Sequence, residues 1–116
     1  MTTNKALQLI AEYDGWVYCG STPNKDRFLY EKEHLMDFLD NLCYLTNLNE
    51  LHRVALGVIN KLVVEFNEAT QVNIYAEAST LIYEIKQKLI YAPVDNQYID
   101  LLFAVAKSVE FINKNK

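Results

Sequence analysis

Glycine is scarce in this sequence, with three residues in 116, and they stand far apart at Gly15, Gly20 and Gly57. A loop that cradles phosphate groups needs clustered glycines, so the chain has neither a GxGxxG turn nor a P-loop. Cysteine is equally scarce. Cys19 and Cys43 have neither metal-ligand spacing nor the density of a disulfide scaffold, which indicates free thiols in a reducing compartment. No apolar run approaches the roughly 18 residues that cross a bilayer.

Basic residues are also few. Eleven Lys and Arg stand against 15 Asp and Glu, which gives a formal net charge of -4. Sequence-independent binding to nucleic acid depends on cations that meet phosphate, so this charge argues against DNA or RNA as a direct partner. The amino-terminal segment has one lysine and a short apolar patch interrupted by polar residues, which does not fit a secretory signal. We expect a cytoplasmic protein without a membrane segment.

Apolar residues make up 51% of the chain, enough for one continuous core, and we expect a single domain over residues 1–116. Helical spacing of these residues predicts helices over 4–13, 31–45, 48–66, 78–90 and 98–112. The segment 70–91 also fits two strands, and the lack of a turn residue between its halves favours a helix. Residues 101–106 are apolar almost all round, so the last helix should be central.

Residue types at four positions predict where helices end or approach a neighbour. Asp14-Gly15 should end the first helix, because glycine adopts the left-handed conformation easily. Asn47 and Glu50 resemble a capping box for the helix over 48–66. A glycine inside that helix, Gly57, predicts a close backbone approach, and Pro93 should end the helix over 78–90.

Two segments between the first helices, 16–20 and 27–31, are rich in β-forming residues and are joined by the turn-prone segment 21–26. We predict a β-hairpin over about 16–30 covered by helices, in an α+β fold that is predominantly helical. An all-α bundle is the alternative fold. Trp16, Tyr18, Phe28 and Tyr30 should share one face of the hairpin, and Val17, Cys19 and Leu29 the other.

Neither face of this hairpin is polar. A half-exposed hairpin normally has one polar face that is exposed to solvent, and two strands alone are only marginally stable in water. Helices should therefore cover one face. The second face needs another helix, a second chain or a binding partner, and more helix from the same chain is the simplest cover.

Candidate catalytic residues are few. Glu31, Glu33, His34 and Asp37 lie close together in sequence, and Glu50 and His52 begin the next helix, which allows a metal cluster of carboxylates and imidazoles. HExxH spacing is absent, however, and no serine lies in a GxSxG turn. Cys19 with His34 or His52 is a weaker candidate pair for nucleophilic catalysis, because a small strand cysteine usually belongs to the core. We expect no enzyme activity, metal or cofactor, with a metal-dependent hydrolase on Glu33, His34, Asp37 and His52 as the alternative.

Tyrosine, by contrast, is abundant, with eight residues. Tyrosine is enriched at protein interfaces because it offers a rigid apolar ring with a polar end. Several acidic residues lie in the segment from Asp26 to Glu50, and an acidic surface formed by this segment would suit a basic partner surface. We therefore expect a partner surface with these candidate contact residues: Tyr18, Tyr30, Glu33, Asp37 and Tyr44.

Three segments resemble a set of short uncharacterised proteins encoded in bacteriophages and prophages: "LIAEYDGW" near the start, "YLTNLNELHRVALGVINKL" in the middle and "AVAKSVEFINKN" at the end. Those proteins typically show an IAEFDGW-like start, a WNxLHRV-like helix and an AVVEFIKWYN-like close. This sequence departs from the pattern at Leu48 and at Phe111-Ile112-Asn113, where the set has tryptophan or aromatic residues. The resemblance implies a phage-related gene product that works in a bacterial cytoplasm, and it implies no catalytic motif.

Small phage accessory proteins without a catalytic signature often act by binding a host protein. The leading hypothesis is therefore a non-enzymatic protein that binds and inhibits a host protein, such as a CRISPR effector or another defence protein. This hypothesis rests on association between classes of protein. The competing hypothesis is a small structural or housekeeping phage protein, a homodimer that buries the second face of the hairpin.

Overall fold

A computed structural model describes residues 1–44, 46–67, 70–95 and 98–115 of the chain. Within these residues the fold is α+β and mostly helical, as predicted, with a three-stranded antiparallel sheet. The helices are α1 (Thr3–Tyr13), α2 (Leu48–Glu65), α3 (Val72–Asp95) and α4 (Tyr98–Lys114). The strands are β1 (Val17–Ser21), β2 (Phe28–Lys32) and β3 (Leu35–Phe38), and a short 3-10 helix, Leu39–Asn41, follows β3.

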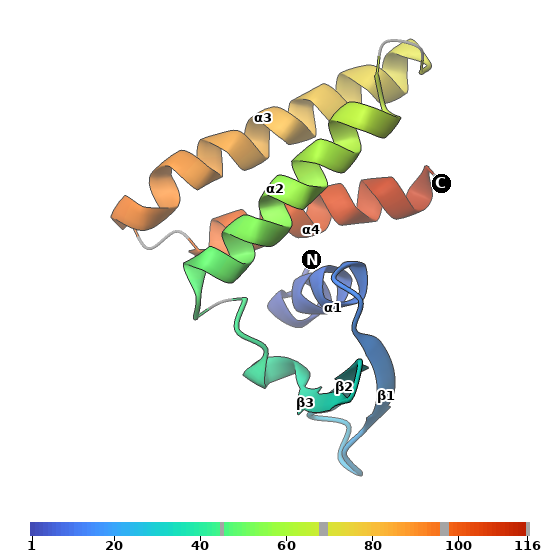
Figure 1. Cartoon of the computed structure of the whole chain (residues 1–116), viewed down its shortest axis with the longest axis vertical. Coiled ribbons are helices and arrows are strands. Elements are labelled where there is room, and N and C mark those ends of the chain that lie inside the picture. Colours follow the sequence, from blue (N-terminus) through green and yellow to red (C-terminus); the bar gives the residue numbers. More distant parts are fainter. Residues whose placement is uncertain (45, 68–69, 96–97, 116) are drawn as a thin grey trace.

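Helix α4 is the central element of the molecule. It packs against α1, α2 and α3, and the sheet lies beyond α1, on the side away from α3 (Figure 1). The apolar middle of α4 explains this position, because its side chains face neighbours in several directions. The prediction of a central last helix is confirmed by the buried residues Leu101, Leu102, Ala104, Val105 and Ala106. None of the helices in the described ranges is long and apolar enough to cross a membrane.

Helix α1 begins and ends as its sequence predicts. The Thr2 hydroxyl accepts a hydrogen bond from the backbone N–H of Lys5 at 3.2 Å, which caps the first turn. Asp14 is the C-cap, and Gly15 follows with a φ of +98°, a conformation that other residues rarely adopt. This glycine turns the chain directly from α1 into the sheet.

The predicted hairpin is present as β1 and β2, with Tyr18 opposite Tyr30. A β-bulge between Tyr18 and Gly20 interrupts the pairing of β1. Strand β3 then pairs with the other side of β2, so β2 is the middle strand and β1 and β3 are both edges. The sheet is therefore one strand larger than the sequence predicts.

The prediction of a helix over 31–45 is wrong for residues 31–44, and Leu45 lies outside the described residues. Lys32 lies opposite Leu35, so Glu33 and His34 form a two-residue hairpin turn, and Glu33 has a φ of +57°. A positive φ is what such turns require and what a helix excludes. Leu35 and Phe38 have helical spacing, yet pairing with β2 determines their conformation. The turn also lacks the asparagine or glycine that usually announces it.

Helix α2 matches its predicted stripe, since the five residues expected on one face are all buried: Leu51, Val54, Ala55, Val58 and Leu62. Asn47 caps the helix, and its side chain accepts a hydrogen bond from the Asn49 N–H at 3.0 Å. The capping box is only half formed, because the Glu50 carboxylate pairs with Arg53 at 2.9 Å. The predicted close approach at Gly57 is wrong: apart from the adjacent backbone of α2 itself, no atom of the described residues lies within 4 Å of where its Cβ would be.

The ambiguous segment 70–91 is helical from Val72 onward, and this part belongs to α3. Its buried side, formed by Ala78, Leu81 and Ile85, packs against α2 and α4. The prediction that Pro93 ends this helix is wrong, because α3 continues to Asp95. A proline φ near −65° is compatible with a helix, and the penalty near a helix end is smaller than in its interior.

Candidate functional site

The sheet has two faces with different surroundings. Alternate residues of β2 point to opposite faces, and the pairing places Val17, Glu31 and Met36 in one row across the sheet. Leu29 and Phe38 form the next row on the same face. The face that carries these two rows is called the outer face, and it also includes Cys19, whose sulfur lies 3.6 Å from the Glu31 carboxylate.

The outer face is apolar and largely exposed. The exposed fraction is 64% for Val17 and 59% for Met36, and Leu29 and Phe38 are half-buried. The Arg27 guanidinium lies 3.9 Å from the centre of the Phe38 ring, in a cation–π contact. We expected more helix from the same chain to cover this face, and that expectation is wrong for the part of the chain that the structure describes. A second chain and a binding partner remain as candidate covers.

The opposite, inner face packs on α1. Tyr30 is the centre of this face and is 1% exposed. Its ring lies 5.7 Å from the ring of Tyr18 in an edge-on arrangement, and Phe28 lies 6.4 Å from Tyr18. Burial, together with the nearby carboxylate of Glu12, raises the pKa of Tyr30 to about 12. The covered face of the predicted hairpin is thus the aromatic face.

Two of the predicted contact tyrosines are not available to a partner. Tyr30 is buried under α1, and Tyr44 is 3% exposed, so the expected acidic surface studded with these rings is not formed. Tyr18 is half-exposed beside the inner face. Residue type favours tyrosine at interfaces, but tertiary packing decides which rings reach the surface.

The two predicted acidic contact residues lie apart, with Glu33 in the β2–β3 turn and Asp37 opposite Tyr30, in the row of the inner face. Glu33 is exposed in the turn. Asp37 is half-buried, and its Oδ1 accepts hydrogen bonds from the backbone N–H of Phe38 at 2.8 Å and from the Asn41 amide at 3.1 Å. Glu33 is therefore open to a partner, while Asp37 also has a local structural role.

Tyr44 belongs to a polar network around Asp14. Its hydroxyl donates to the Asp14 carboxylate at 2.6 Å, and the same carboxylate accepts two hydrogen bonds from Arg53. Lys32 Nζ, from β2, lies 3.6 Å from Asp14 Oδ2. Burial and the hydrogen bond to Asp14 raise the pKa of Tyr44 strongly. The network joins α1, α2 and the sheet, so it positions the sheet relative to the helices.

The candidate metal ligands are not brought together. Among the described residues, no group of three or more His, Cys, Asp or Glu side chains could hold a metal ion. Glu33, His34 and Asp37 lie in and after the hairpin turn, and His52 lies on the exposed side of α2. Cys19 is exposed, and its sulfur lies 3.5 Å from the Val17 carbonyl oxygen and 3.6 Å from the Glu31 carboxylate. Neither His34 nor His52 is among these hydrogen-bond partners of the thiol.

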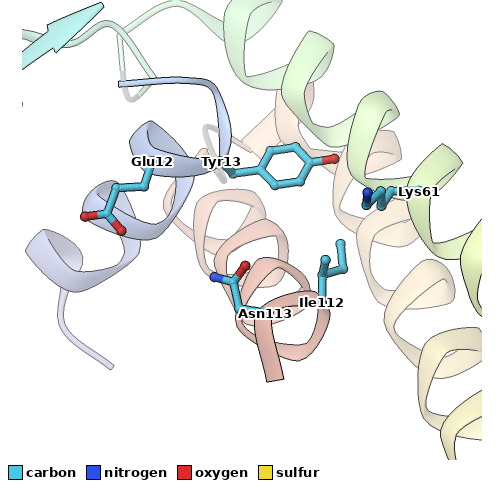
Figure 2. A pocket seen from close by; sticks show the side chains of 5 residues that line it. All are labelled: Glu12, Tyr13, Lys61, Ile112 and Asn113. Carbon is cyan, nitrogen blue, oxygen red and sulfur yellow. The ribbon is translucent and has the colours of Figure 1, made fainter. Parts of the chain in front are cut away.

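A cleft of about 500 Å³ opens where α1, α2 and α4 meet, lined by Glu12, Tyr13, Lys61, Ile112 and Asn113 (Figure 2). The Tyr13 side chain points toward Lys61, while Glu12 points away from it. Lys61 forms a 2.6 Å ion pair with Glu65, and the Tyr13 hydroxyl lies 3.5 Å from the Gly57 carbonyl. Burial raises the pKa of Tyr13. Tyr13 and Lys61 thus already have partners within the chain.

No protein-family model, curated protein or solved structure matches this chain. The surfaces that the fold presents are therefore the basis for assigning a function. Among them the outer face of the sheet is distinctive, because it combines exposed apolar side chains with the acidic Glu31 in the middle row and Glu33 in the adjoining turn.

Sequence reasoning missed the residues that β3 contributes to this face. Met36 and Phe38 were assigned to a helix, so they were not considered together with Val17. The stacking of Arg27 on Phe38 was missed for the same reason. The available signal was that Lys32 and Leu35 flank a pair of polar residues, which is the length of a tight hairpin turn.

Proposed function

We propose that this protein is a non-enzymatic, phage-related ligand of a host protein, and that it inhibits a defence component such as a CRISPR effector. The observation that carries this proposal is the uncovered outer face of the sheet, with Val17 and Met36 as its most exposed members. The resemblance of the sequence to phage and prophage proteins supports the bacterial setting. The proposed contact surface is the outer face together with Glu33 in the adjoining β2–β3 turn. Tyr18 and Asp37 lie in the row of Tyr30 on the inner face, so they are outside this surface.

Apolar burial would supply the affinity. Full burial of a Val or Met side chain contributes about 1.5–3 kcal/mol, and a few such anchors dominate most interfaces. Phe38 and Arg27 add an aromatic ring and a guanidinium that already stack on each other. Both residue types are common among the residues that contribute most to binding. The outer face therefore has the composition of a compact binding surface.

Electrostatics would select the partner. Between residues 26 and 50 the chain has six acidic and two basic side chains, a net charge of -4 that equals the charge of the whole chain. Glu50 of this segment belongs to α2. From β1 to the 3-10 helix, residues 17–41, there are five acidic and three basic side chains, so a net charge of -2 lies around the sheet. A basic protein surface would be attracted to it, and salt should slow the association. Nucleic-acid-binding effectors of host defence are partners of this kind.

The competing proposal is a small structural phage protein whose outer face is covered by a second copy. The open edges and the apolar outer face would serve that role too. The two proposals differ in one measurable respect. A copy-to-copy contact through the outer face predicts that a charge at Met36 changes the mass of the particle, whereas a foreign partner predicts that it changes binding alone.

The experiment measures binding of the full chain to a panel of purified CRISPR effector nucleases and inhibition of their DNA cleavage. The double variant Val17→Asp/Met36→Asp should weaken binding to an inhibited nuclease about tenfold or more. The matched control is Val64→Asp, an exposed valine on α2 remote from the sheet, which should leave binding unchanged. The proposal is wrong if no effector is bound or inhibited, or if the double variant inhibits as well as the wild-type chain.

A further inference from the structure

A hollow of about 220 Å³ lies between α1 and the strands β1 and β2. Its lining residues are Gln8 and Glu12 from α1 and Tyr18, Phe28 and Tyr30 from the sheet. Gln8 and Glu12 are four positions apart, about one turn, so their side chains lie on the same side of the helix. The hollow therefore has one polar wall and one aromatic wall.

The aromatic wall is arranged around Tyr18. The Tyr18 ring is inclined by 64° to the Tyr30 ring and by 50° to the Phe28 ring, with ring centres 5.7 Å and 6.4 Å away. Rings at such angles do not cover one another face to face, and the exposed fraction of Tyr18 is 50%. The face of an aromatic ring has a partial negative charge that attracts cations. An open ring beside two inclined rings is thus suited to a positively charged group.

The polar wall supplies a carboxylate that has no cation beside it. None of the ion pairs among the described residues involves Glu12, and this side chain is exposed. Burial and, after it, the Glu12 carboxylate raise the pKa of Tyr30 to about 12, so the carboxylate lies beside the aromatic wall. Figure 2 shows that Glu12 points away from Lys61 of the neighbouring cleft. The negative charge of Glu12 is therefore available to a ligand.

We propose that this hollow binds the guanidinium group of an arginine side chain from another protein. A guanidinium is planar, stacks on aromatic rings and has several N–H donors, so it can lie against Tyr18 while it donates to the Glu12 carboxylate and the Gln8 side-chain carbonyl. Pockets that enclose whole small molecules have about 300–1,000 Å³, so the smaller hollow suits the end of a side chain. The outer face already contains a contact of this kind, between Arg27 and the Phe38 ring.

The lining favours a guanidinium over other organic cations. A quaternary ammonium group has no N–H, so it would leave Glu12 and Gln8 without a donor. A lysine ammonium has donors, but it is compact and strongly hydrated and does not stack on a ring. The hollow is on the inner-face side, opposite Val17 and Met36. The inference therefore does not rest on the proposed function of the outer face, and either one can fail without the other.

The test titrates the full chain with N-acetyl-arginine methylamide at constant ionic strength and follows binding by NMR. We expect a dissociation constant of about millimolar, because few atoms make contact, and upfield shifts of the ligand Cδ protons over the Tyr18 ring. Tyr18→Leu keeps an apolar side chain but removes the ring, and Glu12→Gln removes only the charge. Each variant should raise the dissociation constant about threefold. Both positions are exposed, so both variants should keep the wild-type circular dichroism spectrum.

The matched controls are Tyr83→Leu and Glu77→Gln, which change an exposed tyrosine and an exposed glutamate of α3, outside the hollow. Both should bind the probe like the wild-type chain. The blocked lysine derivative and tetramethylammonium should bind at least about threefold more weakly than the blocked arginine. The proposal is overturned if the probe shows no saturable binding in the millimolar range, or if the controls weaken binding as much as the variants in the hollow. Equal or tighter binding of tetramethylammonium overturns it too, as does tighter binding of free arginine, since the ligand is then not a protein side chain.

Discussion

Arg53 and Asp14 form a two-pronged ion pair, in which Nη1 and Nη2 of the guanidinium lie 3.0 Å and 2.8 Å from the two carboxylate oxygens. The pair joins the end of α1 to the second turn of α2. The Asp14 side chain is 12% exposed, and it also accepts a hydrogen bond from the hydroxyl of buried Tyr44. Paired charges that are partly buried contribute more than pairs at the open surface.

Asp14→Asn should therefore lower the free energy of unfolding at pH 7 by about 1–3 kcal/mol, because the charge-assisted hydrogen bonds from Arg53 and Tyr44 weaken. Chemical denaturation followed by circular dichroism measures this loss. The control is Asp40→Asn, which breaks the exposed 3.1 Å pair with Arg27 and should cost less than about 1 kcal/mol. An equal loss in the two variants would contradict the assigned role of the Asp14 network.

The same network predicts a pH dependence. Burial alone would raise the pKa of Asp14, but the hydrogen bonds from Arg53 and Tyr44 outweigh burial and hold this pKa below its ordinary value. The unfolded chain then takes up the proton at a higher pH than the folded chain. The stabilisation is complete above the unfolded pKa of about 3.9 and is lost as the pH falls through the lower folded value. Denaturation curves between neutral and strongly acidic pH should show a steeper loss for the wild-type chain than for Asp14→Asn.

Two glycines should respond in opposite directions to alanine. Gly15→Ala should cost about 1–2 kcal/mol, since Gly15 has a φ of +98° that an L-residue adopts only with strain. A Cβ there would lie 3.6 Å from Lys32 Cε, an ordinary contact, so the loss is conformational. Gly57→Ala in the exposed middle of α2 should stabilise the protein by about 0.5–1 kcal/mol. Thermal melting compares both variants, and a change of the same sign in both would be inconsistent with the structure.

Two valines of α2 test the orientation of this helix. Val58 is buried in the core and Val64 is exposed, so the same change to alanine isolates the effect of burial. Val58→Ala should lower the free energy of unfolding by about 2–3 kcal/mol through lost contacts and a cavity. Val64→Ala should be neutral or slightly stabilising, since alanine has the higher helix propensity. A substantial loss in Val64→Ala would mean that this face is covered in solution.

Cys19 should react slowly with alkylating reagents. Partial desolvation and the nearby Glu31 carboxylate raise the pKa of its thiol, so less reactive thiolate is present at neutral pH. Glu31→Gln removes the negative charge and should increase the alkylation rate roughly twofold or more. Mass spectrometry of peptides that contain Cys19 follows this rate, and the other exposed thiol, Cys43, provides an internal reference. An unchanged rate in Glu31→Gln would contradict the contact.

The helices could be predicted because their signals are local. The spacing of Leu51, Val58 and Leu62 identifies the buried side of α2, and Gly15 marks the end of α1. The conformation of residues 35–38 is different, because it depends on pairing with β2, and Leu35 and Phe38 alone have the spacing of a helix. The local pattern of this segment is compatible with both a helix and a strand, and the long-range pairing with β2 determines which one forms.

The candidate site could be predicted only in part. The apolar alternation of Val17 and Leu29 indicates a second face that needs a cover, and that face is present. Which tyrosines reach the surface could not be predicted, because Tyr30 and Tyr44 are placed by contacts with α1 and Asp14. Residue type gives a preference, and the three-dimensional arrangement decides between core and surface.

Neither edge of the sheet is a long, regular strand, and this has a consequence for how the molecule behaves at high concentration. Long, flat edge strands recruit strands from neighbouring molecules and lead to fibres. The bulge between Tyr18 and Gly20 bends β1. At the end of β3, which has four residues, the Asp37 carboxylate already accepts a hydrogen bond from the Phe38 N–H. The chain can therefore expose an apolar sheet face to water without forming fibres through its edge strands.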